Sequence, residues 1–212
     1  MSRTIIKLFF YLCILTVLPS YAQNAVHYYF KTMDIRNGLS QNTVYQILQD
    51  RKGFMWFGTK DGLNRYDGLS YRVYKKENSG LGKNFITALY EDHEGNIWIG
   101  TDGGVFIYNP VLDSFTAFNQ TSDKGTVIKD FVTMIGSDEY DNIWISVENQ
   151  GLFCYNHEKR LWNYLHDSGM SNVARFWLNE STCWLALYAD NLYYTKDNFE
   201  SPLQPFKDAD GN

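Results

Sequence analysis

An all-β fold of repeated four-stranded blades, a β-propeller, is predicted by three features of this 212-residue sequence. The first is an internal repeat, whose similar blocks begin at Gly38, Gly80, Ile128 and Ser171. The second is its period, because the tryptophan that marks each block recurs after 42, 46 and 40 residues, as in propeller arrays. The third is composition, since 17% aromatic residues and only four prolines favour strands. The marker tryptophans are Trp56, Trp98, Trp144 and Trp184.

The second block shows the plan of one blade most clearly. Runs rich in apolar, β-branched and aromatic residues at 85–90, 97–101, 105–108 and 114–118 are separated by short turn segments, and the first block repeats them at 43–49, 54–59, 63–66 and 71–74. Gly53 and Gly95 supply the positive φ of the first turn, and Asp141, at the same place in the third block, tolerates that conformation. We therefore expect about four antiparallel blades, at 38–78, 80–120, 128–166 and, in degraded form, 171–206.

The first 22 residues have the three parts of a secretory signal peptide. Arg3 and Lys7 form a basic start, residues 8–18 carry no charge, and Ser20 and Ala22 are the small residues of a cleavage site. An uncleaved membrane anchor is the alternative, although the apolar run is shorter than the ~20 residues that span a bilayer. We expect residues 1–22 to be removed and residues 23–212 to be exported.

Charge and residue spacing argue against several classes of function. The formal net charge of −5 is unfavourable for binding nucleic acid. Asp50, Asp92 and Asp138 each stand six residues before a marker tryptophan. They are expected to stabilise turns rather than to bind calcium or act as glycosidase carboxylates, because equal positions on successive blades lie too far apart for a carboxylate pair. The sequence has no Ser/His/Asp, Cys/His or phosphate-binding pattern, so no catalytic residue, cofactor or metal is predicted.

Two cysteines remain in the exported chain, Cys154 and Cys183. An oxidising compartment permits a disulfide between them. The other interpretation, which we favour, is that each is a small buried apolar side chain.

The pattern D-x-x-G-[FN]-[IM]-W-[FI]-G-T-x-x-G-[LV], preceded by G-L-[SG]-x-N, resembles the two-component regulator propeller repeat. The residues that carry this resemblance are 38–42, 50–62, 80–84 and 92–104, and it extends less closely over about residues 27–200. It implies the periplasmic sensor region of a Bacteroidetes hybrid histidine kinase, with blades belonging to a seven-bladed ring. Such sensors respond to polysaccharide breakdown products. A free-standing secreted propeller that binds carbohydrate or protein is the alternative.

This sequence contains no counterpart of the family's kinase, receiver or transmembrane helix, so the chain itself is not expected to be an enzyme. Contact with the membrane is expected only through downstream segments. Residues 26–36 resemble an outer strand that would complete a full ring, which predicts the N-terminal part of a longer sensor. A complete four-bladed ring is the alternative.

Ligand contacts are predicted on the turns that follow the second strand of each blade, because these turns share one face of a propeller with the loops that enter the first strands. The expected partners are an oligosaccharide and either the remaining blades or a second sensor chain. We expect the marker tryptophans to pack between blades rather than to stack on sugars. The candidate ligand residues are Lys60, Asp61, Asp102, Glu148, Asn149 and Gln150, with Asn42, Asn84, Asp190 and Asn191 nearby on the same face.

Overall fold

The computed structural model describes residues 28–156, 158–163, 173–179, 182–188, 192–196 and 201–207. The chain divides into two compact units, Met1–Thr32 and Met33–Asn212, and every described strand belongs to the second unit. The predicted signal peptide, residues 1–22, lies outside the described residues.

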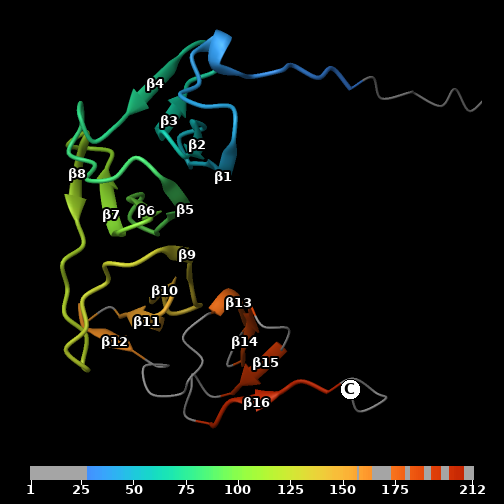
Figure 1. The fold of residues 1–212 in the computed structure, drawn as a ribbon, viewed down its shortest axis with the longest axis vertical. Helices are drawn as coiled ribbons and strands as arrows, with labels where there is room; N and C mark the ends of the chain where they lie inside the picture. The colour runs from blue at the N-terminus through green and yellow to red at the C-terminus, as the bar shows by residue number, and fades with distance from the viewer. Residues whose placement is uncertain are drawn as a thin grey trace, which may run out of the picture. The chain divides into compact units, whose positions relative to one another are not determined.

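The second unit contains four antiparallel sheets of four strands, each with its strands in chain order, as Figure 1 shows. This confirms the predicted all-β fold of about four four-stranded blades, which we number 1 to 4. Blade 1 contains β1 (Val44–Gln49), β2 (Met55–Thr59), β3 (Gly62–Tyr66) and β4 (Tyr71–Tyr74). Blade 2 contains β5 (Ile86–Glu91), β6 (Ile97–Thr101), β7 (Gly104–Asn109) and β8 (Ser114–Ala117). Blade 3 contains β9 (Val132–Ser137), β10 (Ile143–Val147), β11 (Gly151–Tyr155) and β12 (Leu161–Asn163). Blade 4 contains β13 (Val173–Asn179), β14 (Thr182–Leu187), β15 (Leu192–Thr195) and β16 (Gln204–Pro205).

Successive blades pack through their first strands, and the hydrophobic core lies between the sheets. Strand β5 contacts β1 and β2, β9 contacts β5 and β6, and β13 contacts β9 and β10. One cluster of buried side chains fills each of the three gaps between neighbouring blades. The marker tryptophans Trp56, Trp98 and Trp144 belong to these clusters, as expected of residues that pack blade on blade.

The aspartate six residues before the tryptophan holds the first turn of blades 1 to 3. In blade 2, Asp92 Oδ1 accepts the Asn96 backbone N–H (2.8 Å) and Oδ2 accepts the Trp98 indole N–H (2.9 Å). Asp50 binds Trp56 in the same way (2.8 Å), and Asp138 binds Trp144 (2.9 Å). Each carboxylate therefore closes a turn and satisfies an indole N–H, which confirms the predicted turn-stabilising role.

A left-handed residue completes the same turn. Gly53 and Gly95 have φ angles of 88° and 85°, and Asp141 takes the equivalent place in blade 3 at φ 60°. Aspartate is one of the few residues with a side chain that enters this region readily, so the turn keeps its geometry without glycine.

Close approach between blades explains the glycine in the second strand. A Cβ atom at Gly58 would lie 2.8 Å from Ile86 Cγ2, and one at Gly100 would lie 2.6 Å from Val132 Cγ1. In blade 3, Ser146 stands at this place, and its hydroxyl donates to the Val173 carbonyl of blade 4 (2.7 Å). In blades 2 and 3, a β-branched side chain therefore inserts against a glycine of the preceding blade.

The outer strand predicted at 26–36, which would pair in a full ring, stays a prediction. Residues 28–34 have no regular structure, Tyr29 and Phe30 are 95% exposed, and Ile35–Asn37 forms a 3-10 turn (η1) capped by Asp34. Residues 26 and 27 lie outside the described residues. An outer strand depends on a neighbouring strand for its hydrogen bonds, and the segment alone does not supply one. Among the described residues no helix has the length and apolar character needed to cross a membrane.

Cys154 and Cys183 are free thiols, and both are buried in the cluster between blades 3 and 4. Burial raises the pKa of each thiol to about 12. The structure thus agrees with two small buried side chains rather than a disulfide.

Candidate functional site: a cleft between blades 2 and 3

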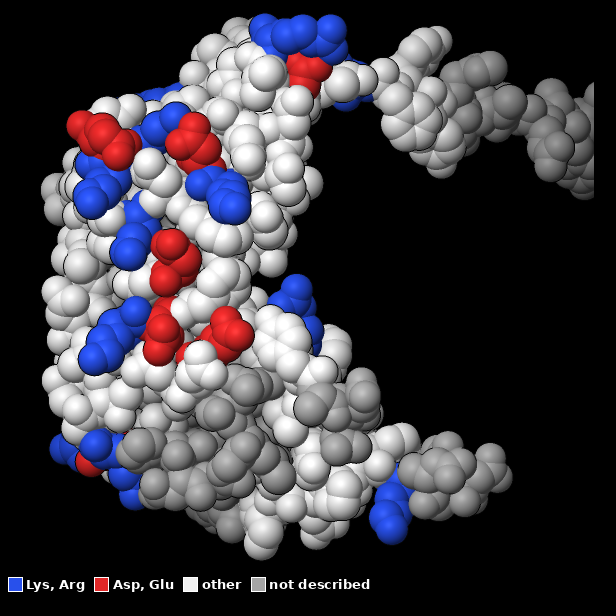
Figure 2. Space-filling model, in the orientation of Figure 1, with Lys and Arg blue, Asp and Glu red and all other residues white. Residues whose placement is uncertain are grey.

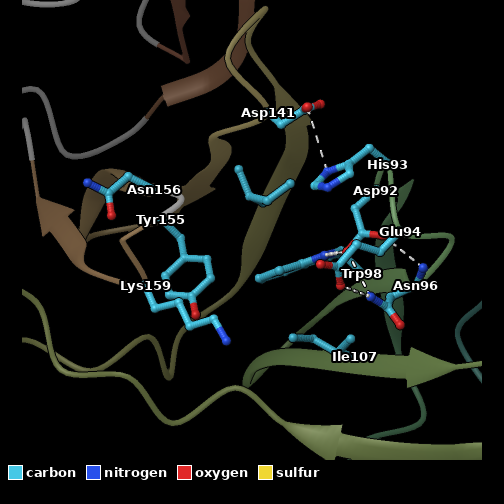
Figure 3. A pocket seen from close by; sticks show the side chains of 11 residues that line it. Asp92, His93, Glu94, Asn96, Trp98, Ile107, Asp141, Tyr155, Asn156 and Lys159 are labelled. Atoms are coloured by element: carbon cyan, nitrogen blue, oxygen red, sulfur yellow. Dashed lines mark hydrogen bonds and ion pairs between the residues drawn. The ribbon is translucent and has the colours of Figure 1, made fainter.

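A cleft of about 410 Å³ opens between the first turns of blades 2 and 3. Figure 3 shows its side chains converging from the two blades. We call it the inter-blade cleft. Its lining residues are Asp92, His93, Glu94, Asn96, Trp98, Ile107, Asp141, Ile143, Tyr155, Asn156 and Lys159.

The inner part of the cleft is apolar and aromatic. Trp98 and Ile107 come from blade 2, and Ile143 and Tyr155 from blade 3. The rings of Trp98 and Tyr155 lie 5.8 Å apart at 50°. The Trp98 indole N–H is bound to Asp92 and its side chain is buried, so this ring backs the cleft rather than offering a donor.

Two side-chain changes leave the part of this gap beside the first turns open, whereas the corresponding part of the gap between blades 1 and 2 is nearly filled. There, Arg51 pairs with Glu91 (2.9 Å) and donates to the carbonyl oxygens of Asp92 and His93. Arg65 lies over Trp56 and donates to the Tyr108 hydroxyl (3.0 Å). A cavity of only about 110 Å³ remains beside Arg51.

His93 and Ile107 occupy the corresponding places in blade 2. His93 follows Asp92 as Arg51 follows Asp50, and Ile107 pairs with Trp98 as Arg65 pairs with Trp56. Both side chains are shorter than arginine. The cleft therefore stands where two arginines fill the preceding gap.

Charged and amide groups form the rim of the cleft. His93 Nδ1 lies 3.8 Å from Asp141 Oδ2 across the gap, and Glu94 accepts a hydrogen bond from Asn96 (3.2 Å). Burial raises the pKa of Tyr155, and the charge of Glu94 adds to that effect. Lys159 brings one cation to the rim. On the face seen in Figure 2, Lys and Arg side chains lie among Asp and Glu rather than in a patch of one sign.

An apolar floor within a rim of carboxylate, amide, imidazole and ammonium groups suits a small ligand with hydroxyl groups and one apolar face. Such a ligand places its carbon face on the aromatic floor and exchanges hydrogen bonds with the rim. Among the described residues no group of three or more His, Cys, Asp or Glu side chains is arranged to hold a metal ion.

A second hollow of about 320 Å³ lies along the first strands and receives residues from all four blades. Gln46, Met134 and Arg175 are among its lining residues. The Arg175 guanidinium donates to the carbonyl oxygens of Thr133 (3.1 Å) and Ala174 (2.9 Å), so it braces β13 against β9.

The sequence-predicted ligand residues lie on turns and do not line the inter-blade cleft. Lys60 and Asp61 form the β2–β3 turn, Asp102 the β6–β7 turn, and residues 148–150 the β10–β11 turn. Asp61 pairs with Lys75 (2.6 Å), and Gln150 accepts from the backbone N–H groups of Lys129 and Asp130. These two side chains therefore fix loops, and ligand contact by the set stays a prediction. Asp190 and Asn191 lie outside the described residues.

Sequence reasoning missed the cleft residues, above all Tyr155 and Lys159. A signal for the cleft was present in the sequence, because the second block has His93 and Ile107 where the first block has Arg51 and Arg65. Interpreting that signal required knowing which positions face the same gap.

Comparisons with known proteins agree with this fold. Residues 38–61 and 80–103 match the repeat model "Two component regulator propeller". The chain is 44% identical over 54 residues, 26% of its length, to "Histidine kinase P4" of Formosa agariphila, and this match spans 4% of that kinase.

Two crystal structures from B. thetaiotaomicron share the fold. The extracellular domain of a protein described as a hybrid two-component system has a TM-score of 0.70 at 24% identity, over 86% of this chain and 28% of that one. The extracellular domain of a protein described as a one-component system has a TM-score of 0.68 at 21% identity, over 87% of this chain and 30% of that one. The chain thus spans under a third of each of these proteins, and at such identity the likeness concerns the fold alone. The matched repeats at 38–61 and 80–103 lie on successive propeller blades, so these two blades are similar to the two-component regulator propeller repeat.

Proposed function

We propose that this chain is a ligand-binding propeller segment of an extracellular sensor that belongs to a two-component regulator. The observation that carries the proposal is the pair of matched repeats, together with the 44% identity to a histidine kinase over 54 residues. The chain would be exported to the periplasm and act there as a sensor rather than an enzyme. The kinase activity of the signalling protein would reside in segments other than this chain.

The proposed ligand is an oligosaccharide released from a polysaccharide, and the proposed site is the inter-blade cleft. The cleft combines the half-buried side chains of Tyr155 and Ile107 with the hydrogen-bonding groups of Asn96 and Asn156. A sugar ring has both an apolar face and a girdle of hydroxyl groups, so each half of the cleft has a counterpart on the ligand. A volume of about 410 Å³ lies within the range of small-molecule sites.

The test is a thermal-shift and calorimetric titration of residues 23–212 with a panel of purified oligosaccharides from depolymerised plant and algal polysaccharides. One chemical class is expected to raise the melting temperature and to bind with measurable heat. If the folded chain responds to no member of the panel, the proposed ligand class is wrong.

A substitution that fills the cleft tests whether the ligand binds there. Ile107→Arg restores the residue that blade 1 carries at this place, so we expect it to abolish binding while the chain stays folded. Leu112→Arg adds the same charge at a side chain that is 72% exposed, outside the cleft lining. It should bind as the wild type does. Loss of binding in both variants, or in neither, would place the ligand elsewhere.

Participation in signalling is tested separately in the source organism. Deleting the codons for residues 80–166, which encode blades 2 and 3, should abolish induction of genes by the bound oligosaccharide. Induction that persists would contradict the sensor role.

A further inference from the structure

Three positive charges that fill or line the gap between blades 1 and 2 have no counterpart in blade 2. Two of them are Arg51 and Arg65, whose places in blade 2 are taken by the shorter histidine and isoleucine. The third is Lys52, which stands two residues after the turn aspartate of blade 1, and blade 2 has Glu94 at this place. The exchange of lysine for glutamate reverses the charge, so the inter-blade cleft presents an anion where the preceding gap has a cation.

The groups that hold the Arg65 guanidinium are nevertheless kept in the cleft. Arg65 lies over the Trp56 ring (5.8 Å) and donates to the Tyr108 hydroxyl (3.0 Å). Tyr155 is the counterpart of Tyr108, since each is the strand partner of the isoleucine that precedes a marker tryptophan. The ring centroids of Trp56 and Tyr108 lie 5.1 Å apart at 60°, and those of Trp98 and Tyr155 lie 5.8 Å apart at 50°. The cleft therefore keeps the aromatic wall and the tyrosine hydroxyl that receive a cation, without the arginine.

Carboxylates outnumber cations around the cleft. The lining includes the carboxylates of Asp92, Glu94 and Asp141 and one ammonium group, that of Lys159. Its net charge is negative whether His93 is neutral or protonated. Burial, and after it the charge of Glu94, raises the pKa of Tyr155, so the field of Glu94 extends from blade 2 to the side chain of blade 3. Figure 3 shows both side chains at the cleft.

We propose that the inter-blade cleft selects an oligosaccharide that carries a free amine, and that the ammonium group of this ligand takes the place of the missing arginine. The inference rests on the proposed function for the sugar part of the ligand and adds a charge to it. The ammonium group donates to the Tyr155 hydroxyl and to the Glu94 carboxylate, and the sugar carbons lie on Ile107. A charge-assisted hydrogen bond is stronger than the neutral bond that a sugar hydroxyl makes. A ligand with carboxylate or sulfate groups is repelled by the same rim.

The first test uses a cation that is not a sugar. Propylguanidinium reproduces the end of the arginine side chain, and propylurea is its neutral analogue. Each is titrated into residues 23–212 and followed by NMR at the indole N–H signals, which Trp98→Phe assigns. Propylguanidinium should shift the Trp98 signal at concentrations at which propylurea does not. Equal responses to the two compounds would overturn the inference.

The second test compares sugars of equal size and linkage. Calorimetry measures binding of a β-linked glucosamine trisaccharide and of the corresponding trisaccharides of glucose and of glucuronic acid, in a buffer in which the amine is protonated. The glucosamine form should bind at least about fivefold more tightly than the glucose form, and the glucuronic acid form most weakly. Equal binding of the glucosamine and glucose forms would overturn the amine preference and leave oligosaccharide binding in place.

Charge variants connect the preference to the cleft. Glu94→Gln should remove most of the preference for the amine without changing the affinity for the glucose form. Lys159→Gln removes the opposing cation and should increase the preference. Glu77→Gln makes the same charge change as Glu94→Gln at an exposed side chain outside the cleft lining, and should have no effect. A preference that survives Glu94→Gln would overturn the inference. Binding of propylguanidinium without any trisaccharide would instead contradict the oligosaccharide ligand of the proposed function.

Discussion

Replacing Asp92 by alanine tests whether the aspartate and tryptophan of blades 1 to 3 act as one structural unit. The change removes the acceptor of the buried Trp98 indole N–H (2.9 Å) and of the Asn96 backbone N–H (2.8 Å). A buried donor left without a partner costs about 1–3 kcal/mol. The loss of the turn bond adds about 1 kcal/mol, because water replaces it only in part. We therefore expect Asp92→Ala to lower the free energy of unfolding by about 2–4 kcal/mol.

The assay is urea unfolding of residues 23–212, followed by tryptophan fluorescence and by circular dichroism. Asp102→Ala is the matched control, because Asp102 is an exposed turn aspartate of the same blade, bound to Phe85 through its backbone N–H. It should change the free energy of unfolding by less than about 0.5 kcal/mol. Asp92→Asn keeps one carbonyl oxygen as acceptor and should fall between the two. Equal midpoints for Asp92→Ala and Asp102→Ala would refute the reasoning.

Three further predictions concern packing, thiol chemistry and pH. Gly100→Ala should destabilise the chain by about 1–3 kcal/mol in urea unfolding, because the new Cβ would lie 2.6 Å from Val132 Cγ1; an unchanged midpoint would mean that the blades separate freely. Cys154 and Cys183, whose pKa values burial raises to about 12, should react with a thiol reagent at pH 8 only after unfolding, so rapid labelling of the native chain would contradict their placement. Hydrogen bonding from Tyr108, then Arg72, lowers the pKa of Asp113 below its ordinary 3.8. Its carboxylate therefore stabilises the fold above pH 3.8. This contribution disappears as the pH falls through the lower pKa that Asp113 has in the folded state. Asp113→Asn should flatten the stability profile in that acid range, and an unaltered profile would count against the interaction.

Local features of the fold were predictable because short-range chemistry determines them. In blades 1 to 3, the aspartate, the left-handed residue and the tryptophan of the first turn lie within seven residues, and their contacts form inside one hairpin. The replacement of glycine by Asp141 was predictable for the same reason, since the backbone angle depends on that residue alone.

Features that depend on distant segments were not predictable. The strand expected at 26–36 requires a partner strand from elsewhere, and its own sequence does not reveal whether one is present. The inter-blade cleft depends on pairs such as His93 and Asp141, which are 48 positions apart in the sequence and meet across a gap. The gap between blades 1 and 2 is filled by the arginines at 51 and 65, whereas the shorter histidine at 93 and isoleucine at 107 leave the cleft. None of these residue types alone indicates a site.

The division of the core among three gaps means that stability is shared between neighbours rather than held at one centre. Each sheet draws its apolar support from at most two others, as repeats do in a one-dimensional array. Blades 2 and 3 are buttressed on both sides, whereas blades 1 and 4 are buttressed on one. The pair of blades that forms the cleft is therefore supported by packed apolar side chains from both sides.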